Sequence, residues 1–147
     1  MIYLKPWSDA QEDAFKVRQT VFIDEKGVPE DMEIDEFDPI AIHALAYREG
    51  QCVGTARLIC QLDESESSRS IGRIGRMAVL APHRGHGLGR ELLEALLQHG
   101  QSQGLYSFEL HAQLDAIAFY ERFGFTPRGD VYDEAGIPHR DMILLLT

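Results

Sequence analysis

Cysteine is scarce in this sequence, and long apolar runs are missing altogether. Among its 147 residues there are only two cysteines, Cys52 and Cys60, which are too few for a disulfide scaffold. No stretch approaches the roughly eighteen consecutive apolar residues that indicate a membrane span. The first residues, MIYLKPWSDAQED, also lack the basic and apolar regions of a signal peptide. We therefore expect a cytoplasmic protein in which both cysteines are reduced core residues.

Basic residues are also few. Lys and Arg number 14 against 24 Asp and Glu, which gives a net charge of −10 and an isoelectric point near 4.9. Because neutralisation of phosphates drives binding to nucleic acids and anionic membranes, neither is an expected partner. The apolar fraction of 44% and the charged fraction of 26% are ordinary for a globular chain. This length predicts a single domain spanning residues 1–147.

The charges are unevenly distributed along the chain. From Asp24 to Asp38 there are eight acidic residues and a single basic one, Lys26. Such a run is either a solvated loop or an entrance that attracts a cationic substrate. The stretch from Ser67 to Arg90 has no acidic residue but contains five arginines, namely Arg69, Arg73, Arg76, Arg84 and Arg90. These arginines are either reserved for an anion or ordinary surface residues.

The hydrophobic periodicity predicts an α+β (α/β) chain. Strands are expected over residues 2–5, 43–49, 52–62, 71–80, 105–112, 126–132 and 141–146. A first helix opens at a capping box of Ser8 and Gln11 and closes by Gly27. The second starts at Leu88 and ends by Gly104, and a short third helix is capped by Asp115. This order predicts a mixed sheet with helices on both faces.

Two glycines in the strand-rich part of the chain predict local features. Gly50 and Gln51 read as a two-residue hairpin loop between consecutive strands. Gly75, in the interior of the next strand, predicts a bulge or a close backbone approach.

The stretch RMAVLAPHRGHGLGRELLEALL contains a strand, a turn, a glycine-rich loop and a helix start in succession. Gly85, Gly87 and Gly89 allow the backbone to approach a ligand, and the helix N-terminus directs unpaired N–H groups at it. This arrangement is typical of pyrophosphate binding. The loop is not a P-loop, because no Gly-Lys-Ser/Thr follows, and Arg90 stands where a dinucleotide fingerprint would need glycine.

Together these residues resemble the GNAT acetyltransferase superfamily, whose acetyl-CoA motif is Gln/Arg-x-x-Gly-x-Gly/Ala. Arg84, Gly87 and Gly89 match that motif, and the later FYERFGF resembles the second motif of the family, with its tyrosine at Tyr120. The segments VFIDEKGVPEDMEIDEFD and YDEAGIPHRDM resemble the ElaA-like branch of small bacterial proteins. The resemblance implies a mixed, mostly antiparallel central sheet of six to seven strands.

The resemblance also implies an N-acetyltransferase that moves an acetyl group from acetyl-CoA to the primary amine of a small molecule by direct attack. The protein is expected to act as a monomer or homodimer. A CoA-binding sensor without turnover and a protein lysine acetyltransferase are the alternatives. Implied coenzyme-binding residues are Met77, Ala78, Val79, Arg84, Gly85, His86, Gly87, Leu88, Gly89, Arg90 and Tyr120.

Tyr120 is the candidate general acid, because a neutral phenol can give its proton to a departing thiolate. His139, near the start of the last strand, is the candidate base, with His43, His111, Glu33 and Glu109 as alternatives. Substrate-binding roles are predicted for Glu33, His43, Arg76 and His111. His83 and His86 have no carboxylate partners near them in the sequence, so no metal is expected.

Overall fold

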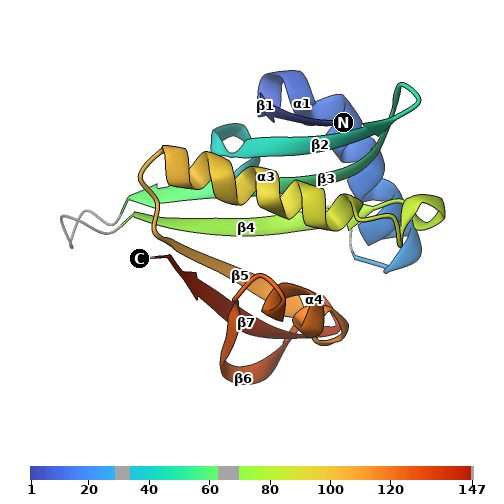
Figure 1. Ribbon diagram of the computed structural model, residues 1–147. Coiled ribbons are helices and arrows are strands. Elements are labelled where there is room, and N and C mark those ends of the chain that lie inside the picture. Colours follow the sequence, from blue (N-terminus) through green and yellow to red (C-terminus); the bar gives the residue numbers. More distant parts are fainter. Residues whose placement is uncertain (29–33, 63–69, 147) are drawn as a thin grey trace. The chain divides into compact units, whose positions relative to one another are not determined.

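A computed structural model of the protein describes residues 1–28, 34–62 and 70–146 (Figure 1). Within these ranges the strands are β1 (Ile2–Pro6), β2 (Ile42–Arg48), β3 (Gln51–Leu62), β4 (Ser70–Val79), β5 (Ser107–Gln113), β6 (Thr126–Glu134) and β7 (Ile137–Leu145). The α-helices are α1 (Trp7–Arg18), α3 (Leu88–Ser102) and α4 (Ile117–Glu121). Shorter helical segments are η1 (Gln19–Glu25), η2 (Asp38–Ile40), η3 (Ala81–His83) and η4 (Leu114–Ala116).

The strands form one seven-stranded sheet in the order β1-β2-β3-β4-β5-β7-β6. The pairs β1-β2, β2-β3, β5-β7 and β6-β7 are antiparallel. The predicted α+β class, with a mostly antiparallel sheet of six to seven strands, is therefore confirmed. The chain divides into two compact units, here called the first unit (Met1–Ile59 and Ile74–His99) and the second unit (Cys60–Arg73 and Gly100–Thr147).

Helix α1 starts differently from the prediction. Its N-cap is Pro6, with extended backbone and no capping side chain, so Ser8 lies inside the first turn and no capping box forms. Proline can directly precede a helix, because its missing N–H is one of those a helix start leaves unpaired. The predicted single helix also divides into α1 and the π-helical η1, and it ends before Gly27, whose φ is +74°.

Helices α1 and α3 cover opposite faces of the sheet in the first unit. Leu45 of β2 packs against Ala14 of α1. A Cβ placed on Gly54 of β3 would lie 3.2 Å from Leu92 of α3 and 3.4 Å from Ala46 of β2. Because successive side chains of a strand point to opposite faces, Leu45 and Ala46 assign the two helices to opposite sides of the sheet (Figure 1). The predicted helices on both faces are confirmed.

Helix α3 is the longest α-helix of the described residues, with fifteen residues. Leu92, Leu93 and Leu96 on it are completely buried, whereas Arg90 and Glu91 are exposed, so the helix is amphipathic. Across residues 1–28, 34–62 and 70–146, no helix combines the length and the apolar character needed to cross a membrane.

The hairpin turn between β2 and β3 lies one residue earlier than predicted. Glu49 and Gly50 have φ of 51° and 78°, and Gln51 already pairs with Arg48 as the first residue of β3. Two consecutive residues of positive φ match the twist of a two-stranded ribbon, which selects this turn. The irregularity predicted at Gly75 is found at its neighbour Arg76, which has a φ of 50°.

In the second unit, β5, β7 and β6 form an antiparallel ribbon with an apolar and a polar face. The apolar face is buried and includes Phe108, Leu110, Met142 and Leu144. His111 pairs in register with Asp141, and Tyr132 pairs with His139. Because side chains alternate along a strand, these four side chains share the polar face of the ribbon.

Candidate active site

The glycine-rich loop joins η3 to α3 in the first unit. Gly85 and Gly87 have φ of +82° and +80°, a left-handed conformation that favours glycine, and a Cβ on either would meet nothing within 4 Å. The N–H of Glu91 donates to the carbonyl of Gly87 (3.1 Å). The N–H groups of the preceding helical turn therefore have no intrahelical acceptor. An open backbone with such donors fits a phosphate group.

Arginines of the stretch that lacks carboxylates find carboxylates elsewhere in the chain. The shortest N–O distances are 2.7 Å for Arg73–Glu109, 3.1 Å for Arg76–Asp35, 2.8 Å for Arg84–Glu25 and 2.9 Å for Arg90–Glu94. Arg69 lies outside the described residues. The structure therefore favours ordinary ion-paired arginines over a set of side chains reserved for an anion.

Arg84, which was predicted to bind the coenzyme, has its donors engaged. Its Nη1 and Nη2 donate to the two oxygens of Glu25 and its Nε donates to the carbonyl of Val79, each at 2.8 Å. The hydrogen bond from Arg84 lowers the pKa of Glu25. Arg84 thus connects the end of η1 to the end of β4, and its predicted role in binding the coenzyme stays a prediction.

Met77, Ala78 and Val79 are the last three residues of β4, which Leu80 separates from η3. Ala78 is buried and packs against Val17 of α1 and Val21 of η1. This end of β4 is therefore in contact with both helical segments. The pairing of its backbone with pantetheine, which the family resemblance implies, stays a prediction.

A buried network of ion pairs occupies the first unit. Asp38, which is 0% exposed, accepts two hydrogen bonds from Arg18 (2.9 and 3.0 Å) and one from Arg57 (2.9 Å). Asp35 accepts two from Arg57 (2.7 and 2.8 Å) and one from Arg76 (3.1 Å). The network therefore ties α1, β3 and β4 to the segment that precedes β2.

Arginines keep both aspartates charged. Burial acts to raise the pKa of Asp38, but hydrogen bonds and charge from Arg18, with the charge of Arg57, outweigh it and hold this pKa below its ordinary value. The pKa of Asp35 is lowered in the same way, mainly by Arg57. In the acidic run, Glu25, Asp35 and Asp38 thus face arginines of the protein. The interpretation of the run as an entrance for cations is wrong for these three carboxylates.

The predicted substrate-binding residues His43 and Arg76 both belong to this network. His43 is 1% exposed; its Nε2 lies 3.0 Å from the carbonyl oxygen of Asp38, and its ring lies 4.9 Å from that of Trp7. Burial lowers the pKa of His43, so the neutral ring donates from Nε2. His43 therefore supports η2, and its predicted role in substrate binding stays a prediction. Glu33 lies outside the described residues.

Tyr120, the predicted general acid, lies on α4 in the second unit and is 9% exposed. Its ring makes edge contacts with Phe119 and Phe125, at centroid distances of 5.1 and 6.0 Å. Burial raises the pKa of Tyr120 to about 12, so the phenol is protonated at neutral pH. The environment suits a proton donor, and the catalytic role stays a prediction.

His139, the predicted base, is 6% exposed and lies in a polar cluster of the second unit. Its Nδ1 lies 2.7 Å from the carbonyl oxygen of Ile137, its Nε2 lies 3.4 Å from Oε2 of Glu134, and its ring stacks on Tyr132 at 6.2 Å. The Nδ1 of His111 lies 3.0 Å from Oε1 of Glu134. Glu134 therefore joins two histidines that the sequence singled out separately. Glu134 was not among the residues predicted from the sequence, although its segment YDEAGIPH is typical of a strand, a turn and a strand.

Glu109, His83 and His86 are the remaining residues that the sequence singled out. Glu109, an alternative base, is paired with Arg73 at 2.7 Å. His83 is half-buried in η3 and His86 is exposed in the loop. In the described part of the chain, no group of three or more His, Cys, Asp and Glu side chains is arranged to hold a metal ion.

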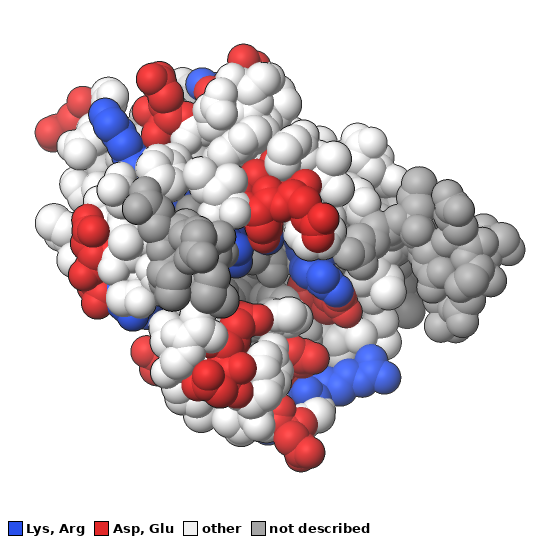
Figure 2. Space-filling model, turned by 180° about the vertical axis from the view of Figure 1, so that it is seen from behind, with Lys and Arg blue, Asp and Glu red and all other residues white. Residues whose placement is uncertain are grey.

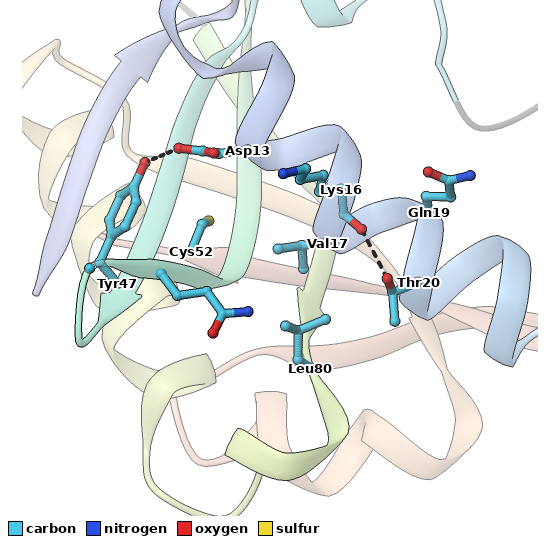
Figure 3. Close-up of a pocket in the computed structure, with 10 residues that line it drawn as sticks. Asp13, Lys16, Val17, Gln19, Thr20, Tyr47, Cys52 and Leu80 are labelled. Atoms are coloured by element: carbon cyan, nitrogen blue, oxygen red, sulfur yellow. Dashed lines mark hydrogen bonds between the residues drawn. The ribbon is translucent and has the colours of Figure 1, made fainter.

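A pocket of about 440 Å³ lies in the first unit, lined by residues of α1, η1, β2, β3 and the turn between these strands, and by Leu80 (Figure 3). Tyr47 donates a hydrogen bond to Asp13 on its wall. Cys52 also lines it, and burial raises the pKa of this thiol to about 11, so it is protonated at neutral pH and a weak nucleophile. None of the predicted site residues lines this pocket.

Acidic side chains are more widespread than basic ones on the face shown in Figure 2. This distribution follows from the net charge of −10. A surface with this charge attracts cationic ligands more strongly than anionic ones, except where backbone N–H groups can bind an anion.

Comparisons with known proteins agree with this geometry. Residues 4–125 match the family described as "Acetyltransferase (GNAT) family". The chain is 33% identical over 133 residues to "Uncharacterized N-acetyltransferase YjcF" of Bacillus subtilis, covering 90% of each chain. It is 33% identical over 132 residues to "Protein ElaA" of Escherichia coli, covering 86% of this chain and 82% of that protein.

Solved structures give the same result. The crystal structure of Escherichia coli ElaA matches with a TM-score of 0.84 and 26% identity, over 98% of this chain and 99% of that one. The crystal structure of an acyl-CoA N-acyltransferase from Pseudomonas aeruginosa matches with a TM-score of 0.81 and 29% identity, over 98% of each chain. The resemblance drawn from the sequence motifs is confirmed.

Proposed function

Because the chain belongs to the GNAT acetyltransferase family, we propose that it transfers an acetyl group from acetyl-CoA to the primary amine of a small molecule. The observation that carries this proposal is the open loop at the start of α3, with left-handed Gly85 and Gly87. The acyl-CoA chemistry named for the Pseudomonas aeruginosa relative supports the choice of donor. Cys52 is half-buried and Cys60 is exposed, so the prediction that both lie in the core is wrong. As free cysteines they accord with the reducing cytoplasm as the location of the protein.

Binding of the coenzyme is assigned to backbone groups of the first unit. The N–H groups from Gly85 to Arg90 would hold the pyrophosphate, because those of Leu88 to Arg90 begin α3 and lack intrahelical acceptors. The backbone of Met77 to Val79 would pair with pantetheine as an added strand does. A strand N–H there would face the oxygen of the thioester, and losing one such donor typically costs about 10²–10³ in rate.

Proton transfer is assigned to side chains of the second unit. Acetyl-CoA, when bound, supplies the thioester carbonyl that the amine attacks. Tyr120 gives its proton to the departing thiolate. Because the pKa of Tyr120 is raised to about 12, above the ordinary value of about 8.5 for a thiol, this donation is favourable only if the phenol regains a proton from the acylated nitrogen. Removal of the first proton from the amine is assigned to the cluster around His139.

The glycine loop yields a direct test of coenzyme binding. Gly87→Val places a branched side chain at a φ of +80°, which costs about 1–2 kcal/mol in the left-handed region and displaces the backbone donors. We expect the affinity for acetyl-CoA to fall by at least about tenfold, as measured by calorimetry. Gly104→Val is the matched control, because Gly104 has a φ of +87° and lies after α3, away from the loop. Equal affinities of the two variants would refute the assignment.

The activity itself is tested by thiol release from acetyl-CoA with a panel of spermidine, free amino acids and a lysine peptide. We expect release with at least one free amine and transfer of the acetyl group to its nitrogen, as checked by mass spectrometry. Coenzyme binding without release on any amine would indicate a sensor. Release with the peptide alone would indicate a protein lysine acetyltransferase.

A further inference from the structure

The polar cluster of the second unit is built around one carboxylate. Oε1 of Glu134 lies 3.0 Å from Nδ1 of His111, and its Oε2 lies 3.4 Å from Nε2 of His139. The three side chains come from β6, β5 and β7, so pairing of the strands fixes their spacing. Glu134 is thus in contact with a histidine on each side.

The hydrogen bonds of His139 identify which of its nitrogens can receive a proton. Nδ1 lies 2.7 Å from the carbonyl oxygen of Ile137, and a carbonyl only accepts, so Nδ1 carries the hydrogen. In the neutral ring Nε2 therefore has a free lone pair, and this lone pair is on the side of Glu134. The only basic atom of the ring thus faces the carboxylate.

Exposure separates the two residues further. The side chain of His139 is 8% exposed, whereas that of Glu134 is 45% exposed. A ligand arriving from solvent therefore meets the carboxylate of Glu134 before the imidazole. A carboxylate is also the group that pairs directly with an ammonium ion.

We propose that Glu134 meets the cationic amine and takes its proton, and that His139 receives this proton from Glu134. This inference rests on the proposed acetyl transfer and names the base of that same reaction. Glu134 is the catalytic residue, because it contacts the amine. His139 acts through Glu134, so it is a positioning residue that also holds the proton.

The proton moves in two steps. An N–H bond of the ammonium breaks and an O–H bond forms on Glu134, which leaves a neutral amine. The O–H bond then breaks and an N–H bond forms at Nε2 of His139, which restores the carboxylate and leaves an imidazolium beside it.

The other charged and titratable groups around the pair have partners of their own. Tyr132 donates its hydroxyl hydrogen to Asp141, and Nε2 of His111 lies 3.7 Å from the same carboxylate. Arg73 of β4 pairs with Glu109 of β5. These groups therefore pair with one another, whereas Glu134 pairs with the two histidines.

The test compares Glu134→Gln and His139→Gln, with Asp130→Asn as a matched loss of an exposed carboxylate on the same strand. Thiol release from acetyl-CoA is measured with the panel amine that the wild-type protein acetylates fastest. Glu134→Gln should raise KM for the amine and lower kcat/KM by about 10²–10⁴. His139→Gln should lower kcat without changing this KM, because Glu134 still meets the ammonium. Asp130→Asn should behave as wild type.

Chemical rescue separates catalysis from misfolding. Glu134→Ala should regain activity in proportion to added sodium formate, since formate can occupy the place of the lost carboxylate. If Glu134→Gln keeps wild-type kinetics while His139→Gln raises KM, the amine meets His139 and this proposal is wrong. Absence of formate rescue would also overturn it. A wild-type protein that acetylates no amine would instead refute the proposed function, and this assignment with it.

Discussion

Replacing Tyr120 with phenylalanine should lower kcat by about 10²–10⁴, while acetyl-CoA binding stays at the wild-type level. The substitution removes only the hydroxyl group, and the ring keeps its contacts with Phe119 and Phe125. Because the phosphates are proposed to bind backbone N–H groups of residues 85–90, the loss of this one hydroxyl should leave the affinity unchanged. Steady-state kinetics and calorimetry on the same preparation measure the two effects separately.

The control for this prediction is Tyr106→Phe, because Tyr106 is 68% exposed and has no proposed role. The pH dependence gives a second check. With a pKa of about 12, Tyr120 remains protonated through neutral and moderately alkaline pH, so it should cause no alkaline loss of kcat there. A wild-type kcat in Tyr120→Phe would leave the residue with a packing role only.

Asp38→Ala should destabilise the protein by about 3–5 kcal/mol, because it leaves the buried guanidinium groups of Arg18 and Arg57 without their shared carboxylate. Total stabilities of domains are typically about 5–15 kcal/mol, so the variant is expected to approach the limit of folding. Urea unfolding followed by circular dichroism measures the change. Glu36→Ala, at an exposed acidic residue of the same segment, should stay within about 0.5 kcal/mol of wild type.

The lowered pKa of Asp38 also predicts how the stability of the protein changes in acid. Its pKa is lower in the folded protein than in the unfolded chain, where the ordinary value is about 3.9. The stabilising contribution is therefore complete above this ordinary pKa and is lost as the pH falls through the folded value. Asp38→Ala should show a smaller loss of stability below about pH 4 than wild type. An equal loss in both proteins would assign the acid response to other carboxylates.

The sequence by itself determined which elements form and where the glycine-rich loop lies. Strand and helix periods reflect which side chains must be buried, and these are local properties of the chain. The glycines at 85 and 87 were likewise readable, because a left-handed backbone at the start of a helix requires this residue type. The ends of the elements were predicted less accurately. Ser8 is not the N-cap of α1, because Pro6 already occupies that position.

Only the tertiary structure decided the partners of the charged side chains. Asp38 and Arg57 are 19 residues apart and Arg73 and Glu109 are 36 apart, so no local pattern shows that they neutralise one another. For the same reason the sequence did not indicate Glu134, whose contacts with His111 and His139 depend on the pairing of three strands. Ion pairs and proton routes are set by distances across the sheet, whereas the sequence records only distances along the chain.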